Sequence, residues 1–439
     1  MKKIIVLCII TALVGIFIGC KGKDGQQAAG QTKRTIKYLC SSNDTETWVV
    51  GLKAMAKKFA ETHPGFELEV EVANDQAARQ QKIKTLAASG EYYDWFSTDR
   101  DPFMQGLASR GDVVNIRDLL KEMGKPDALY DIAYKFNAFD DGSLYFFSFI
   151  SVMEYFWYHP SHFEKAGIKK TDIVTFDDLM AAFKKLQAVG YQPLAMCASE
   201  WYVQRWIAFV PFRLTANDFI DQLKYNKIDM ASPVGLESAQ WISSLSPYLA
   251  SGWAADDNNA MVESFIAGNS SILYYGTWDP TVFLASDGSL KPDIDCFMLP
   301  TLGRGRDRTL PTDAWANSGT GTAFATKHMD SINKEFIKFI LDEMHQNSVR
   351  HLYLPSVKPT AQQVASFPQG FQNILNDILA VKDFGTCWDI NVDPATYEAL
   401  GKGMVNLMLK QLTPDQFCRF VDNAIDNNAE KYWAAAGVQ

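Results

Sequence analysis

Residues that often carry catalysis are present in this sequence, but not at the spacings that catalysis requires. The six histidines form no HExxH motif, and the chain contains no GxSxG turn and no phosphate-binding glycine loop. Residues 303–308 are rich in glycine and arginine, and acidic pairs such as Asp140-Asp141 and Asp256-Asp257 lie beside glycine or in polar runs, which is typical of solvated turns. We therefore expect no metal ion, no cofactor and no enzymatic activity.

Tryptophan is more abundant than a core needs, and some tryptophans stand close to carboxylates. The chain has 11 Trp, 17 Tyr and 28 Phe. A pyranose ring has apolar C–H faces and a rim of hydroxyl groups, so it needs flat aromatic platforms with Asp, Glu, Asn or Arg beside them. Asp313 and Trp315 lie in a polar loop, where a tryptophan is costly unless something covers it, and an aspartate follows Trp388. These three residues are candidates for contacts with a sugar. Three other tryptophans lie in apolar or helical stretches and are predicted to belong to the core: Trp157, Trp206 and Trp241.

Length and charge limit the possible partners. The 439 residues are 47% apolar and 21% charged, which describes a globular chain too long for one core, so we expect two domains. The 42 basic and 51 acidic residues give a net charge of −9, without a long run of Lys or Arg. Nucleic acids and anionic membrane surfaces are therefore not expected partners.

The N-terminus predicts export. Two lysines precede an uncharged, mainly apolar run over residues 4–18, which is shorter than the ~20 residues of a membrane-spanning helix and fits the core of a signal peptide. The run leads to Cys20 and resembles a bacterial lipoprotein signal, although Phe17 stands where such signals usually have Leu. We predict a lipoprotein signal peptide over residues 1–20, lipidation of Cys20 as a membrane anchor, and a flexible tether over residues 21–33. A plain secretory signal is the alternative.

The first part of the mature sequence predicts alternating strands and helices. Residues 36–40 and 66–72 are expected to be strands, the second because apolar residues alternate with Glu, and residues 52–59 carry apolar side chains at helical spacing. A second helix and a short strand at Trp95-Phe96 follow. This order predicts an α/β layer fold, in which ligands collect at the carboxyl ends of the strands.

The later part of the sequence predicts further helices and a passage between domains. An apolar run over residues 144–158 is long for one strand, so the chain is expected to cross between domains there. Thr175, with Asp178 three residues later, predicts the start of a helix that ends at Gly190. Further predicted elements are helices over residues 236–248, 261–267 and 334–344 and a strand over residues 271–275.

Several sequence blocks occur in a specific order along the chain. They are residues 142–145 (GSLY), 156–159 (FWYH), 163–168 (FEKAGI), 175–179 (TFDDL), 265–269 (FIAGN), 275–278 (YGTW) and 296–300 (CFMLP). In order and spacing these blocks resemble extracellular solute-binding protein family 1, the family that includes maltose-binding protein. The resemblance covers nearly all of the mature chain.

The resemblance implies an α/β, two-lobe periplasmic-binding-protein fold of type II, the Venus-flytrap kind, with interlobe crossings. On this basis we expect an N-terminal lobe of residues 34–147 plus 296–352 and a C-terminal lobe of residues 148–295 plus 353–439. The chain is expected to be an extracytoplasmic monomer that binds a carbohydrate between its lobes. It is then expected to deliver the carbohydrate to the permease subunits of an ABC importer.

The resemblance also implies ligand-binding residues. Asp99 and Arg100 resemble an Asp-Arg pair that contacts sugar in maltose-binding relatives. Glu200 and Tyr202 look like a Glu-x-Tyr that those relatives use similarly, although Trp201 replaces a proline that is common there. Three further candidates come from the family blocks and from the polar segment after the first strand: Trp278, as a ligand-stacking tryptophan, Asp279 and Glu46.

Two alternatives stay open. The first is the same fold with another polar solute as its ligand, and an anion would be favoured if Arg304, Arg306 or Arg308 turned into the cleft. An exported glycoside-active enzyme is the second alternative. It would need two carboxyl groups roughly 5–10 Å apart across a cleft, one of them in an apolar setting.

Overall fold

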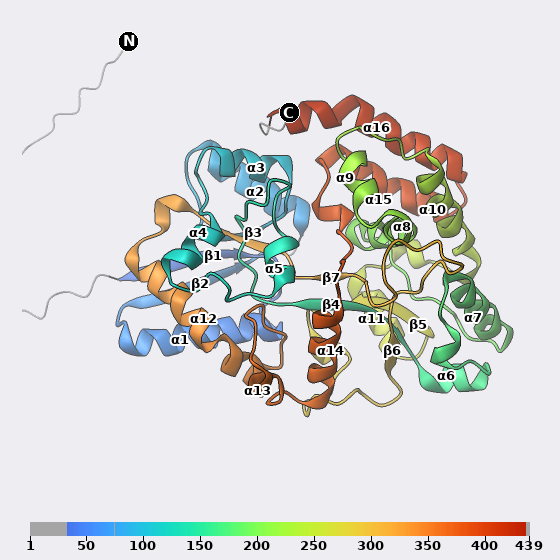
Figure 1. The fold of residues 1–439 in the computed structure, drawn as a ribbon, viewed down its shortest axis with the longest axis horizontal. Coiled ribbons are helices and arrows are strands. Elements are labelled where there is room, and N and C mark those ends of the chain that lie inside the picture. Colours follow the sequence, from blue (N-terminus) through green and yellow to red (C-terminus); the bar gives the residue numbers. More distant parts are fainter. Residues whose placement is uncertain (1–32, 74, 436–439) are drawn as a thin grey trace, which may run out of the picture.

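The structure, a computed structural model, describes residues 33–73 and 75–435. The predicted signal peptide, Cys20 and all but the last residue of the predicted tether lie outside the described residues. The described chain forms two lobes side by side, each built on its own sheet (Figure 1). None of its helices is both long and apolar enough to cross a membrane.

The first lobe is built on a sheet with the strand order β2-β1-β3-β8. The strands β1 (Arg34–Cys40), β2 (Phe66–Val72) and β3 (Trp95–Thr98) are parallel, and β8 (Gly321–Phe324) runs antiparallel to β3. The glutamates of β2 are exposed and its apolar residues face inward, as the alternation predicts. Because β1 and β3 are parallel neighbours, their carboxyl ends meet at one edge.

Helices cover both faces of this sheet. On one face α1 (Thr47–Thr62) packs against α12 (Ser331–His351), together with α4 (Ile116–Glu122). The other face is covered by α2 (Gln76–Ala88) and α3 (Pro102–Ser109). The short α5 (Asp131–Lys135) lies close to the second lobe (Figure 1). Two apolar cores, one on each face, therefore hold the carboxyl edge of the sheet in place.

The second lobe is built around β4 (Val152–Tyr158), all seven residues of which are buried. It pairs antiparallel with β5 (Ile272–Gly276) and β6 (Asp295–Phe297), and its first residues pair with β7 (Ala316–Asn317). Burial of both faces explains why the sequence of β4 is continuously apolar and aromatic.

Most helices belong to the second lobe. The helix α7 (Phe176–Ala188) begins at the predicted capping residue Thr175, whose Oγ1 accepts a hydrogen bond from Asp178 N at 3.2 Å, while the Asp178 carboxylate accepts one from Thr175 N at 2.9 Å. The other helices of this lobe are α6 (Pro160–Lys165), α8 (Glu200–Thr215), α9 (Asp218–Leu223), α10 (Pro233–Ser244), α11 (Asn258–Ile266), α14 (Gln369–Ala380), α15 (Pro394–Met408) and α16 (Pro414–Ala435). The short α13 (Ala361–Val364) lies on the segment between α12 and α14. Short 3₁₀ turns are η1 (Lys170–Asp172), η2 (Ser246–Tyr248), η3 (Trp253–Ala255), η4 (Pro280–Val282), η5 (Thr326–His328) and η6 (Trp388–Ile390).

The chain passes between the lobes more than once, as the family resemblance implies. Phe147 pairs with Thr322 of the first lobe, and β4 begins five residues later in the second. The chain returns after β7 and crosses a third time between α12 and α14. The prediction started the returning segment at residue 296, but β6 and β7 both pair with β4, and Leu299 and Ala314, which lie between them in the chain, pack in the core of the second lobe. The return therefore comes about twenty residues later than predicted, because an aromatic β-pairing that the sequence did not reveal holds β6 in the second lobe.

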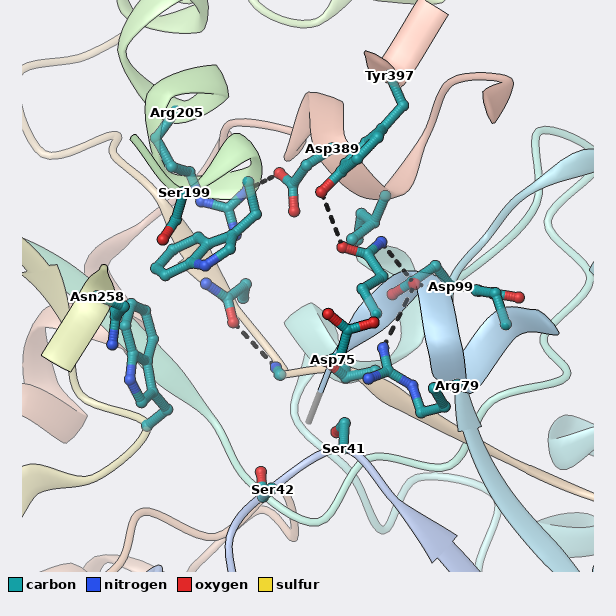
Figure 2. Close-up of a pocket in the computed structure, with 18 of the residues that line it drawn as sticks. Ser41, Ser42, Asp75, Arg79, Asp99, Ser199, Arg205, Asn258, Asp389 and Tyr397 are labelled. Carbon is teal, nitrogen blue, oxygen red and sulfur yellow. Dashed lines mark hydrogen bonds and ion pairs between the residues drawn. The ribbon is translucent and has the colours of Figure 1, made fainter. Parts of the chain in front are cut away.

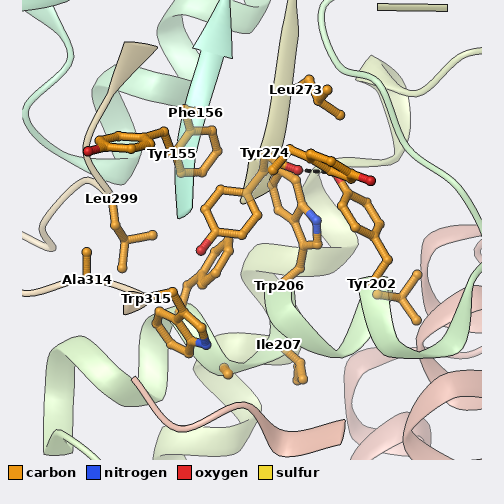
Figure 3. Close-up of a cluster of buried hydrophobic side chains, with 14 of the residues drawn as sticks. Tyr155, Phe156, Tyr202, Trp206, Ile207, Leu273, Tyr274, Leu299, Ala314 and Trp315 are labelled. Atoms are coloured by element: carbon orange, nitrogen blue, oxygen red, sulfur yellow. Dashed lines mark hydrogen bonds between the residues drawn. The ribbon is translucent and has the colours of Figure 1, made fainter. Parts of the chain in front are cut away.

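Aromatic side chains fill the core of the second lobe (Figure 3). Trp157 lies parallel to Phe283 with a centroid distance of 3.8 Å, and Trp206 is completely buried. Both tryptophans belong to the core as predicted. Trp241 is half-buried and stacks on Trp206 at 6.1 Å, so it packs against the same core.

Candidate ligand-binding cleft

A cavity of about 920 Å³ lies between the lobes. This volume is at the upper end of the ~300–1,000 Å³ that is typical of small-molecule sites. The first lobe lines the cavity with the residues that follow β1 and β3 and with the N-terminal parts of α1 and α2. The second lobe contributes the beginning of α8, the residues after β5, η6 and α15. Figure 2 shows Ser199, Arg205 and Asn258 facing Asp75 and Arg79 across the open space.

Aromatic rings of the second lobe form one wall. Trp278 meets the ring of Trp201 edge-on at 5.6 Å and that of Tyr275 at 4.4 Å, and it packs against the cores of both lobes. Gly276 makes this placement possible, because a Cβ there would lie 2.1 Å from the Trp278 ring. The last residue of β5 is thus small so that the next tryptophan can fold back over it.

A ring and a carboxylate of the first lobe face this wall. Trp48 stacks on Phe149 at 5.3 Å and donates a hydrogen bond from Nε1 to Glu46 at 3.1 Å. Glu46 also accepts a hydrogen bond from Asn43 N at 3.0 Å. Burial raises the pKa of Glu46, while these hydrogen bonds lower it. Glu46 is therefore a carboxylate held in a fixed position beside an aromatic surface.

The polar wall of the first lobe is built around Asp99. Its carboxylate accepts hydrogen bonds from Gln76 at 2.9 Å and Gln80 at 3.1 Å, and Arg79 Nη2 lies 3.7 Å away. Gln76 Oε1 in turn accepts a hydrogen bond from the Tyr397 hydroxyl of α15 at 3.1 Å. This last contact joins the lobes across the cavity (Figure 2).

A buried ionic group supports the opposite wall. Arg205 of α8 contacts the Asp389 carboxylate and lies 3.3 Å from Glu154 of β4, whose carboxylate also accepts a hydrogen bond from Asn317 Nδ2 at 2.8 Å. The guanidinium lies 5.7 Å from the ring centroid of Trp201, so it also holds that aromatic platform. Burial raises the pKa of Glu154, and Arg205 acts against this effect. The cluster therefore links α8, β4 and η6 behind the cavity.

The charged residues of the lining carry more negative than positive charge. Among the side chains that the structure describes, seven carboxylates and four cations give a balance of 4 − 7, or −3. The three arginines that would have favoured an anion do not line the cavity; Arg306 pairs with Glu237 at 2.7 Å, and Arg308 pairs with Asp218. The charged residues that line the cavity are Glu46, Asp75, Asp99, Asp101, Asp257, Asp389, Glu398, Arg79, Lys84, Arg205 and Lys402. No group of three or more metal-ligating side chains occurs in the part of the chain that the structure describes.

Of the nine candidate residues whose side chains the structure describes, three line the cavity: Glu46, Asp99 and Trp278. Arg100 is buried behind it, and its Nη1 donates to the carbonyl oxygen of Ala138. The hydroxyl of Tyr202 donates to Tyr274 O at 2.9 Å within the core.

The structure places four other candidates in supporting positions. Asp279 accepts hydrogen bonds from the backbone and hydroxyl of Thr281 at 3.1 and 2.6 Å and caps η4. Asp313 is fully buried and accepts from the backbone nitrogens of Leu310, Lys382 and Asp383. Trp315 packs edge-on against Phe209 and Phe212, and Trp388 stacks on Phe219 at 5.9 Å. These four residues hold loops and core together rather than facing the cavity, and the side chain of the tenth candidate, Glu200, is not among those described.

Sequence reasoning missed most of the lining. A usable signal was present in α2, where Gln76, Arg79 and Gln80 repeat at helical spacing and form a polar stripe on a half-buried helix. Further residues missed as site residues are Trp48, Asp75, Trp201, Arg205, Asn258, Asn317, Asp389 and Tyr397.

Two α/β lobes, joined by several crossings and enclosing a polar and aromatic cavity, define a two-lobe solute-binding protein with the type II periplasmic fold. The chain belongs to the bacterial extracellular solute-binding protein family, whose model matches residues 45–347.

Similar proteins and solved structures support this family assignment. The chain is 21% identical over 94% of its length to an uncharacterised ABC transporter extracellular-binding protein of Pyrococcus horikoshii, and the match covers 98% of that relative. A chitin oligosaccharide binding protein has the same fold, with a TM-score of 0.76, 21% identity and coverage of 90% of this chain and 99% of that one. A Streptococcus pneumoniae solute-binding protein in complex with the blood group A-trisaccharide gives a TM-score of 0.71 at 18% identity and covers 90% of this chain and 100% of its own.

Proposed function

We propose that this chain is the carbohydrate-binding subunit of an ABC importer. The supporting observation is that both lobes bring aromatic rings and polar groups to one cavity, with the Trp278 group on the second lobe facing Glu46 and the Asp99 group on the first. Trp278 offers a flat face for the C–H surface of a pyranose, and Asp99 with Gln76 offers groups for its hydroxyls. Family members of the same fold that bind oligosaccharides support this assignment.

The charge of the lining favours a neutral sugar over an acidic one. The carboxylate excess of three would repel a uronate or a sugar phosphate. Hydroxyl groups, in contrast, donate hydrogen bonds to carboxylates and accept them from Arg and amide groups, and so suit a wall of mixed charge.

The volume of the cavity favours more than one sugar ring. At about 920 Å³ it approaches the largest sites that hold drug-sized ligands. An oligosaccharide also uses both walls at once, because its rings extend from the Trp278 side towards the residues of α2 and α15. We therefore infer a neutral oligosaccharide as the ligand.

A calorimetric titration of the protein with neutral mono- and oligosaccharides, each paired with a uronic acid counterpart, tests this function. We expect at least one neutral oligosaccharide to bind, and to bind at least ~10-fold more tightly than its acidic counterpart. A panel without any binder would refute the sugar assignment. Product analysis of the same mixtures distinguishes binding from hydrolysis, since released sugar would identify an enzyme.

Replacing the central tryptophan tests the aromatic wall. We expect Trp278→Ala to weaken binding of that oligosaccharide about 10–100-fold, as is typical of a buried aromatic anchor at the centre of an interface. Trp388→Phe is the matched control, because Trp388 is buried against Phe219 and does not line the cavity. Equal losses of affinity in the two variants would contradict a stacking role for Trp278.

Export and anchoring belong to the same proposal. A subunit that collects a solute outside the cell needs to stay close to its permease, and lipidation of Cys20 would keep it there. Metabolic labelling with a fatty acid should label the wild-type chain and leave Cys20→Ser unlabelled. Release of an unlabelled, processed wild-type protein would instead indicate a plain secretory signal.

A further inference from the structure

A charged cluster joins the lobes outside the ligand cavity. Asp140 Oδ1 of the first lobe lies 3.0 Å from Lys224 Nζ of the second, and its Oδ2 accepts a hydrogen bond from the Tyr225 hydroxyl at 2.8 Å. Asp221 lies 3.7 Å from Lys224 on the second-lobe side. Arg100, on the first-lobe side, is close enough to influence the charges of both Lys224 and Asp140. None of these residues lines the cavity.

Both sides of this contact are held firmly in their own lobes. Asp140 lies at the tip of a hairpin in which Ala138 pairs with Leu144, and the Phe139 side chain is buried in the core of the first lobe. Lys224 directly follows α9, which the second-lobe core holds. The contact between Asp140 and Lys224 can therefore form only when the two lobes themselves come close together.

Neighbouring elements support the same interface. The ring of Tyr225 meets Trp433 of α16 edge-on at 4.9 Å. The helix α16 in turn contacts α3 of the first lobe, and Figure 1 shows the C-terminal end of α16 next to α3. The cluster thus lies on the side of the cleft where two helices also meet across the boundary.

The Lys224 side chain is buried, and its closest carboxylate comes from the other lobe. The Lys224 side chain is 1% exposed, whereas that of Asp140 is 47% exposed. Burial lowers the pKa of Lys224, and the nearby Arg100 lowers it further. Burial alone would raise the pKa of Asp140, but Lys224 and Tyr225 hold it below its ordinary value. A buried ammonium group is costly without counter-ions. Within its own lobe Lys224 has Asp221 at 3.7 Å and donates to Asn391 Oδ1 at 3.4 Å, and Asp140, at 3.0 Å, adds a closer carboxylate while the lobes lie together.

We propose that Asp140, Lys224 and Tyr225 form a latch that stabilises the closed arrangement of the lobes. This inference rests on the proposed function, because closure matters for a protein that encloses its ligand. The latch raises the closed fraction of the free protein without touching the ligand. Since apparent affinity scales with the fraction of molecules in the binding-competent state, the latch tightens binding and slows release.

The latch can be tested without any sugar. Spin labels on Lys121→Cys in α4 and Lys431→Cys in α16, both exposed positions, report the distance between the lobes of the full-length protein. A Cys296→Ser background avoids the one described native thiol that is not fully buried. We expect Asp140→Asn to reduce the short-distance population at least ~5-fold, the lower end of typical coupling effects, and Tyr225→Phe to have a smaller effect. An unchanged distance distribution in Asp140→Asn would overturn the proposal.

The matched control is Asp141→Asn in the same hairpin. The Asp141 carboxylate accepts hydrogen bonds only within its turn, from the backbone and hydroxyl of Ser143 at 2.8 and 2.6 Å. We expect Asp141→Asn to keep the wild-type distances, and a loss equal to that of Asp140→Asn would assign the effect to the turn and overturn the latch. Circular dichroism confirms that each variant is folded.

Ligand release provides a second measurement. With an oligosaccharide identified by titration, Asp140→Asn should release it about 5–20-fold faster than Asp141→Asn does. If no sugar binds but Asp140→Asn still lengthens the interlobe distance, the latch stands and the sugar assignment fails. If sugar binds and Asp140→Asn changes neither distance nor release, the latch fails and the proposed function stands.

Discussion

Asp101 is a carboxylate that the fold buries at the start of α3. Its Oδ1 accepts a hydrogen bond from Met104 N at 2.8 Å, and its side chain belongs to the lining of the cleft. Burial raises the pKa of Asp101 from 3.8 to about 6, although the hydrogen bond to Met104 N lowers it. The native state therefore holds this proton more tightly than the unfolded chain does.

This shift predicts how stability depends on pH. Below pH ~4 both states are protonated at Asp101, and between pH ~4 and ~6 only the native state keeps the proton, so stability falls as the pH rises through this range. We expect Asp101→Asn, which cannot ionise, to gain up to about 3 kcal/mol in unfolding free energy relative to wild type between pH 4 and pH 7. Urea unfolding at both pH values measures this difference.

Asp257→Asn is the control for that measurement. Asp257 caps α11 in the same way, accepting from Ala260 N at 2.8 Å, but it is exposed. Its variant measures what an amide does in place of an exposed capping carboxylate, and the gain of Asp101→Asn is taken relative to it. A gain for Asp101→Asn that does not increase between pH 4 and pH 7 would contradict the raised pKa of Asp101.

Neighbouring residues explain why the site was only partly predictable from the sequence. The family resemblance indicated Asp99 and Arg100 together, but only Asp99 lines the cavity. The backbone turns directly after β3, where Asp101 N donates to Asp99 O at 2.9 Å, and the Arg100 side chain is directed to the carbonyl oxygen of Ala138. The candidates Glu200 and Tyr202 lie in the first turn of α8, which begins at Glu200. In this helix Tyr202 turns into the core and Trp201 into the cavity. The sequence identifies the segment, and the rotation of the helix about its axis decides which of its side chains faces the cavity.

At the scale of elements, local sequence signals predicted where helices and strands lie along the chain, but not which strands pair with each other. The capping residues of α7 and the alternation in β2 depend on neighbours in the sequence, and both predictions are confirmed. The placement of β6 depends on a pairing with β4 that spans more than 130 residues, for which residues 295–297 carry no local signal. Long-range pairing therefore limits what the sequence can predict about the lobe boundary.

The end of β5 provides a test of how an element positions the site. Gly276→Ala would place a Cβ 2.1 Å from the Trp278 ring, so the ring must move. Because the strand itself is kept, we expect oligosaccharide affinity to fall at least ~10-fold while unfolding free energy falls by less than about 3 kcal/mol, the usual range for overpacking. Calorimetric titration and urea unfolding measure the two quantities.

A second glycine serves as the control for this substitution. A Cβ on Gly106 in α3 would have its nearest contact at 3.5 Å, with the end of the Arg110 side chain. Gly106→Ala should therefore leave affinity unchanged and keep or raise stability, as expected for alanine in a helix. Unchanged affinity in Gly276→Ala would mean that the position of Trp278 does not matter for binding.

At the scale of the whole molecule, the two walls of the cleft belong to different lobes. Trp278 follows β5 of the second lobe and Asp99 follows β3 of the first. A ligand that contacts both walls therefore has a higher affinity for the closed arrangement than for the open one. Because of this difference in affinity, ligand binding increases the fraction of molecules in the closed arrangement.

The protein should consequently become more compact when it binds its oligosaccharide. We expect small-angle X-ray scattering to give a smaller radius of gyration at saturating sugar than without sugar, because closure brings two rigid lobes together. Trp278→Ala is the matched control: at a sugar concentration that saturates wild type but lies below the dissociation constant of the variant, it should keep the larger radius. If wild type binds the sugar calorimetrically and its radius stays constant, the ligand makes its contacts without moving the lobes. The lobes would then already be closed in the protein without sugar, and the contact between Asp140 and Lys224 would stabilise that closed arrangement before the sugar binds.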